Sequence, residues 1–191
     1  MLKLMRRAAI RSLVCAFAFF LLAGVASTPG LNAAERGAPE IQTELSALPE
    51  PVKKMRERIL EAARSGNIDA MHPIVEMNEL KPTVSFGGAN DPVAYWKQVS
   101  GDGQGREIMA IMIEILQMPF VHTAAGTSNE IYVWPYLTML EPEKLTPSQQ
   151  VDLYRLMSPD EAKAMKEFGS YIHYRLGIGP DGTWHFFVAG D

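Results

Sequence analysis

Thiols are nearly absent from this chain of 191 residues, whose single cysteine is Cys15. With one cysteine no intrachain disulfide can form, so packing must hold the fold together. After residue 34 the chain has no thiol at all. Thiol catalysis, disulfide exchange and cysteine–metal sites are therefore excluded for that part.

The sequence signatures of several enzyme classes are missing as well. The chain has no His-Glu-x-x-His, no Gly-x-Ser-x-Gly and no glycine-rich dinucleotide fingerprint. Its four histidines are scattered singly, at His72, His122, His173 and His185. We therefore expect no metal site and no cofactor, and the sequence favours a non-enzymatic protein.

An excess of positive charge is also lacking. The chain has 18 Lys and Arg against 22 Asp and Glu, a net charge of −4. Four of the basic residues and none of the acidic ones lie in residues 1–34, so the remainder would carry −8. Such an acidic body is a poor partner for nucleic acid and for anionic membrane surfaces.

Residues 1–34 have the pattern of a secretory signal peptide. Lys3, Arg6, Arg7 and Arg11 form a basic start, residues 13–26 are apolar, and small residues follow. We expect cleavage between about residue 26 and residue 34 and a periplasmic or secreted protein. An uncleaved membrane anchor is the alternative, but a span needs about 20 apolar residues.

Local signals predict one α+β domain over residues 51–191, after a flexible lead-in at residues 35–50. We expect four to five helices on a small antiparallel sheet. The helix near residues 105–118 is apolar over most of its circumference, with Glu107 and Glu114 on its one polar arc, which indicates a buried central helix. Capping boxes with proline start two further helices at Thr146 and Ser158.

The chain closes in a predicted β-hairpin. Gly179-Pro180-Asp181-Gly182 suits a turn with Gly182 left-handed. This turn predicts the pairs Ile178–Trp184, Leu176–Phe186 and Tyr174–Val188, all on one face. His173 and His185 share the other face about 13 Å apart, too far to bind one metal ion.

Two further strands are predicted around residues 120–123 and 131–134, and they hold the candidate functional residues. Tyr132, Trp134 and Tyr136 would share one face, where exposed aromatic rings could grip a peptide or stack on a sugar. A second layer of core is the equal alternative for these three rings.

His122 is the most interesting histidine, because Glu130 or Glu114 could form an acid–base pair with it. Two hypotheses follow from these candidates. The first is an exported bacterial envelope protein, a non-enzymatic binding or accessory module for an envelope protein or small ligand. The alternative is a small envelope hydrolase that acts on cell-wall or sugar substrate through His122 with Glu114 or Glu130.

Overall fold

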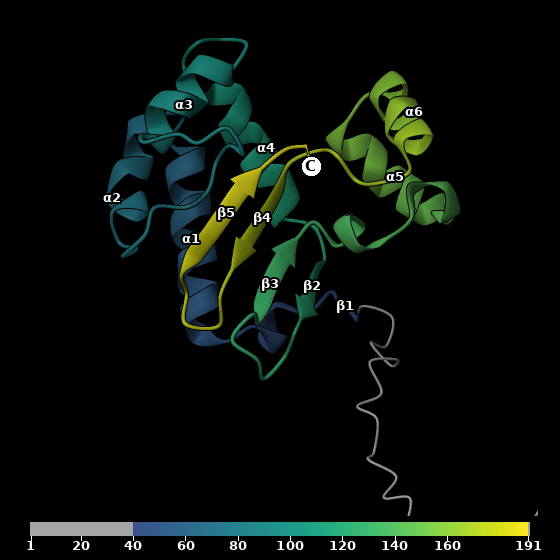
Figure 1. Cartoon of the computed structure of the whole chain (residues 1–191), viewed down its shortest axis with the longest axis horizontal. Coiled ribbons are helices and arrows are strands. Elements are labelled where there is room, and N and C mark those ends of the chain that lie inside the picture. The colour runs from purple at the N-terminus through teal and green to yellow at the C-terminus, as the bar shows by residue number, and fades with distance from the viewer. Residues whose placement is uncertain (1–39, 191) are drawn as a thin grey trace, which may run out of the picture. The chain divides into compact units, whose positions relative to one another are not determined.

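The computed structural model describes residues 40–190 (Figure 1). The predicted signal peptide and residues 35–39 of the predicted lead-in lie outside the described residues. From Glu40 onward the lead-in contains a short strand, β1 (Ile41–Gln42), and a 3₁₀ helix, η1 (Leu45–Ala47). This part of the lead-in is thus built into the fold, and Leu48 at its end is buried.

The described residues form an antiparallel sheet of five strands in the order β1-β2-β3-β4-β5. The four longer strands are β2 (Phe120–Thr123), β3 (Ile131–Trp134), β4 (Arg175–Ile178) and β5 (Trp184–Val188). The α-helices are α1 (Glu50–Arg64), α2 (His72–Val75), α3 (Pro92–Val99), α4 (Arg106–Leu116), α5 (Pro147–Leu156) and α6 (Pro159–Phe168). Short 3₁₀ helices are η2 (Ile68–Met71), η3 (Tyr136–Met139) and η4 (Pro142–Lys144). The predicted α+β class and the antiparallel sheet are confirmed.

Helix α3 is the α-helix that the sequence prediction missed, and it brings the α-helices of the described residues to six rather than four or five. Its signal was present: the Asp91 side chain accepts from the backbone of Val93 and Ala94, and Pro92 occupies the first turn. This is the same combination of cap and proline that correctly located α5 and α6, whose capping boxes at Thr146 and Ser158 both form.

The sheet carries a hydrophobic core on each face. On the first face α1, α3 and α4 pack against aromatic residues of the sheet, and Trp96 stacks on Trp184 with 5.6 Å between ring centroids. Figure 1 shows α1 running behind β4 and β5. On the second face Val121 and Val133 belong to a separate core cluster with η3 and with buried residues of α5 and α6. Two covered faces explain why these strands are apolar on both sides.

Helix α4 fills the first core, as predicted. Ile108, Met109, Met112 and Ile115 are buried, whereas Glu107 on the polar arc is exposed. The last carbonyl of the helix, at Leu116, accepts from Arg56 Nε at 3.0 Å and from its Nη2 at 2.7 Å. A guanidinium from α1 therefore satisfies a helix end that would otherwise lack partners.

The C-terminal hairpin has the predicted turn but not the predicted register. Gly182 is left-handed, and Ile178 pairs with Trp184 as expected. Beyond this pair a β-bulge at His185 shifts the strand by one residue. The predicted pairs Leu176–Phe186 and Tyr174–Val188 were wrong, because Phe186 pairs with Gly177, Phe187 with Leu176 and Val188 with Arg175.

Two residues of the segment before α3, Asn78 and Thr83, form hydrogen bonds with β5 around the bulge. The N–H of Thr83 donates to the His185 carbonyl, and the N–H of Phe187 donates to the Thr83 carbonyl, both at 2.9 Å. The Asn78 side chain donates to the Trp184 carbonyl at 2.9 Å and accepts from its N–H at 3.3 Å. The outer edge of β5 is thus covered by residues about a hundred positions earlier in the chain.

The shifted register places the Phe186 ring over Gly177 on the second face. A Cβ atom built on Gly177 would lie 2.5 Å from two carbons of that ring and 2.8 Å from Ile131 Cδ1. Gly177→Ala should lower the free energy of unfolding by about 1–3 kcal/mol, because the ring must move off the sheet. Urea denaturation measures this loss.

Gly87→Ala is the matched control for that substitution. Its added Cβ would meet only Ser85 Oγ, at 3.5 Å, which is ordinary contact. The control should change the free energy of unfolding by less than about 0.5 kcal/mol. A Gly177→Ala variant as stable as this control would show that Phe186 does not pack against Gly177.

Candidate functional site

One of the two acid–base pairs suggested by the sequence forms. His122 Nε2 lies 2.8 Å from Glu130 Oε1, and both side chains are largely shielded from solvent. Glu114 does not take part, because its carboxylate faces Arg155 Nη2 at 3.4 Å. The pair therefore joins β2 to the end of the loop before β3, and it does not reach the central helix.

The environment of the pair indicates a structural role. The second oxygen of Glu130 accepts from the N–H of Gly126 at 2.8 Å, so the carboxylate closes the loop between β2 and β3. The His122 ring stacks on Tyr132 with 4.3 Å between centroids. The Gly126 hydrogen bond, followed by the one with His122, lowers the pKa of Glu130. His122 lines none of the three hollows described below.

The predicted contact face of Tyr132, Trp134 and Tyr136 is buried, and the three rings do not share a face. Trp134 has 0% exposure and packs with Tyr132 in the first core. Tyr136 follows a cis peptide bond at Pro135 and enters the second core, where its hydroxyl donates to Asp152 at 2.8 Å. The prediction of an exposed aromatic face was wrong, and the alternative of core residues is correct.

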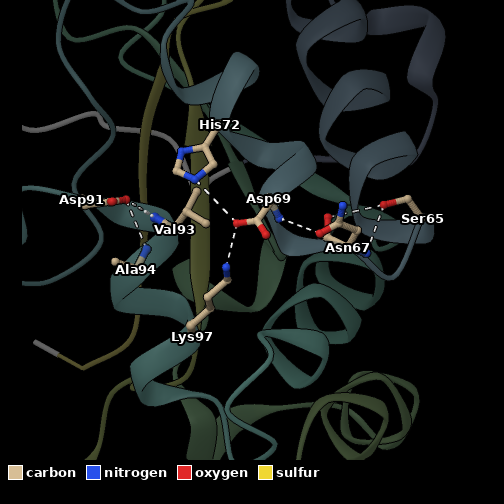
Figure 2. Close-up of polar contacts among 8 residues, drawn as sticks. All are labelled: Ser65, Asn67, Asp69, His72, Asp91, Val93, Ala94 and Lys97. Atoms are coloured by element: carbon tan, nitrogen blue, oxygen red, sulfur yellow. Dashed lines mark hydrogen bonds and ion pairs between the residues drawn. The ribbon is translucent and has the colours of Figure 1, made fainter.

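A second polar cluster lies on the surface between η2 and α3 (Figure 2). Asp69 receives Lys97 Nζ at 2.7 Å and faces His72 Nε2 at 3.6 Å. The hydrogen bond from Lys97 lowers the pKa of Asp69. Asn67 caps η2 through the N–H of Asp69. These contacts tie two exposed helix ends together, and the cluster is interpreted as structural.

A groove with a volume of about 730 Å³ lies where α4 faces α5 and α6. We call it the α4–α6 groove. Helix α4 contributes Glu107, Ala110 and Ile111, and the chain from Tyr154 to Pro159 lines the opposite wall. Glu161 and His173 complete the lining. A smaller cavity of about 190 Å³ adjoins it and shares Met157, Glu161 and His173.

His173 is the unusual residue of the α4–α6 groove. Its Nε2 atom is buried and has no hydrogen-bond partner. Burial lowers the pKa of the imidazole, although the charge of Glu161 opposes this shift. The ring is therefore neutral at pH 7. Buried polar atoms normally have partners, so this nitrogen, like Trp96 Nε1 and Trp134 Nε1, is an exception among the described residues.

Sequence reasoning placed His173 on the hairpin face and missed the groove. The residue precedes β4, which begins at Arg175, and lies beside the N-terminal turn of α6. The only available signal was the pair of capping boxes, which fixed the helix starts but not where the helices dock. No pattern along the chain relates α4 to residue 173.

Within residues 40–190, His, Asp and Glu side chains do not gather in the groups of three that could hold a metal ion. None of the helices in this range combines the length and hydropathy that a bilayer crossing requires.

Comparison of the chain with family models, with curated proteins and with solved structures gave no match. Function is therefore inferred from the geometry of this chain alone.

The structural role of the His122–Glu130 pair predicts a pH-dependent effect of Glu130→Gln. A carboxyl whose pKa is lowered in the folded state stabilises the fold at pH values above its ordinary pKa, here 4.5. This contribution is lost as the pH falls through the lowered value. The variant should therefore be less stable than the wild type at pH 7, and the difference should shrink toward pH 3.

Urea denaturation at both pH values measures the effect. Glu143→Gln, at an exposed position in η4, is the control and should follow the wild type at both. A stability difference between wild type and Glu130→Gln that is the same at pH 7 and pH 3 would contradict the assigned role of the carboxylate.

Proposed function

We propose that this chain is an exported protein of the bacterial envelope and that its folded domain is a non-enzymatic binding module. The observation that carries the proposal is the α4–α6 groove of about 730 Å³, in which apolar side chains lie beside Glu107, Arg155 and Glu161. Binding sites are typically concave and mostly apolar, with a few polar groups that orient the ligand. Ile111, Leu156 and Met157 supply apolar lining here.

The polar groups of the groove support binding rather than catalysis. Glu107 accepts from the N–H of Gly101 at 2.6 Å, and Glu161 accepts from the N–H and hydroxyl of Ser158 at 2.8 and 2.7 Å. Glu107 is thus tied to the loop before α4, and Glu161 to the N-cap of α6. The arrangement can recognise a molecule but lacks a paired catalytic group.

Export is supported by the first 34 residues, whose basic start and apolar run are typical of a signal peptide. Expression of the full chain in a Gram-negative host should yield a periplasmic protein whose N-terminus lies between about residues 27 and 35. Edman sequencing of the periplasmic fraction measures this. An intact N-terminus in the membrane fraction would favour the uncleaved anchor.

Ala110→Trp tests the groove as the binding site. Ala110 is exposed on α4, so an indole there should fill the groove while the fold keeps its stability within about 0.5 kcal/mol. Fragments found in an NMR screen should shift amide signals around the groove, and Ala110→Trp should abolish those shifts.

Arg106→Trp, exposed one turn earlier on α4 but absent from the groove lining, is the matched control and should retain binding. Fragments that bind only elsewhere would overturn the proposed site.

The 2.8 Å contact of His122 with Glu130 favours a second candidate, a small envelope hydrolase acting on cell-wall or sugar substrate. The hydrolase would convert its substrate, whereas the binding module would bind its ligand without converting it. Release of soluble fragments from peptidoglycan by the wild type, abolished in His122→Gln, would establish the hydrolase and overturn the binding module. Binding in the groove without turnover would support the first candidate.

A further inference from the structure

A hollow of about 270 Å³ lies on the second face of the sheet, at β4 and β5. We call it the Phe86 hollow, and it is lined by Thr83, Phe86, Arg175, Phe186 and Val188. The β4–β5 pairs Gly177–Phe186 and Arg175–Val188 are two positions apart, so their side chains share this face. None of the five lining residues belongs to a helix.

The walls of the Phe86 hollow are fixed by the fold. Thr83 forms two backbone hydrogen bonds of 2.9 Å with β5, and the next side chain, Val84, is buried. Val188 is also buried. The hollow is therefore formed before a ligand arrives, as is usual for small-molecule sites. Its volume is slightly below the range of about 300–1,000 Å³ typical of drug-sized ligands, so it suits a molecule with one ring.

Phe86 presents an aromatic ring to this hollow. The ring is 62% exposed, and the guanidinium carbon of Arg175 lies 6.0 Å from its centroid. This distance is at the outer limit of a cation–π contact, so the pair gains little from it. The half-buried ring of Phe186 lies beside them in the lining. A ring that enters the hollow thus meets two aromatic side chains and one cation.

Arg175 can stack on a bound ring without giving up its hydrogen bonds. Its Nη1 donates to the Tyr171 carbonyl at 3.4 Å. The N–H groups of a guanidinium lie in its plane, whereas an aromatic ring packs against its flat face. The face of an aromatic ring is negative and attracts the guanidinium, which a saturated ring does not. A positively charged ligand would meet the like charge of Arg175.

We propose that the Phe86 hollow binds a small uncharged molecule that carries one aromatic ring. The ring contacts the guanidinium of Arg175 and the side chains of Phe86 and Phe186. This site is separate from the α4–α6 groove, because the two share no lining residue. It goes beyond the proposed function by adding a second binding site and the chemical class of its ligand.

A matched pair of probes tests the preference for an aromatic ring. We would titrate the protein with 2-phenylethanol and with 2-cyclohexylethanol, and follow the amides of Thr83, Phe86 and Phe186 by NMR. The saturated ring buries about as much apolar surface, so hydrophobic burial alone predicts equal affinity. Aromatic and cation–π contacts should make 2-phenylethanol bind about threefold to tenfold more tightly. The cation 2-phenylethylamine should bind more weakly than 2-phenylethanol.

Phe86→Leu removes the ring at an exposed position and keeps an apolar side chain. It should reduce the preference for 2-phenylethanol to below about twofold. Phe168→Leu, at a phenylalanine of 60% exposure on α6 and outside the lining, is the matched control and should keep the preference. Arg175→Met removes the cation and should also reduce the preference. Thermal unfolding checks that this variant folds, and Phe86→Leu decides the question if it does not.

Three results would overturn the aromatic site. The first is binding of 2-cyclohexylethanol as tight as that of 2-phenylethanol, and the second is the absence of shifts at the hollow with either probe. The third is an equal effect of Phe86→Leu and Phe168→Leu, which would place the bound ring elsewhere. None of these results bears on the α4–α6 groove, which the fragment screen and Ala110→Trp test separately.

Discussion

The β-bulge at His185 is the constraint on which the two hydrophobic cores, one on each face of the sheet, depend. Without it, alternation along β5 would place Trp184 and Phe186 on one face. With it, Trp184 and Phe187 enter the first core while Phe186 covers Gly177 on the second. One short strand thus supplies large rings to both sides of the sheet, and both helical layers find an apolar surface to bury.

Structural features that depend on a few neighbouring residues were predicted correctly from the sequence. Features that depend on contacts between distant parts of the chain were not. The caps at Thr146 and Ser158 and the turn ending at Gly182 each depend on neighbours within about four residues, so the sequence specifies them directly. The bulge is stabilised by Asn78 and Thr83, which lie far from β5 in the chain. A register argument based on the hairpin alone could not include their contribution.

The candidate sites show the same difference between local contacts, which the sequence predicts, and long-range contacts, which it does not. His122 and Glu130 are eight positions apart in one hairpin, and their pairing was among the two predicted from the sequence. Burial of Trp134 depends on α1 and α4, which pack against that face of the sheet, so strand alternation could not decide whether the ring was exposed. The α4–α6 groove combines three helices with a residue of the chain before β4, and no spacing in the sequence encodes that arrangement.

The hydrogen bonds that Asn78 and Thr83 make to β5 also affect how the protein behaves at high concentration. Strands at the border of a sheet can recruit strands of other molecules and so begin aggregation. Here one border is occupied by the chain's own backbone, and β1 at the opposite border is only two residues long. The sheet therefore offers little backbone for edge-to-edge polymerisation, a protection suited to a domain that has no disulfide to prevent its partial opening.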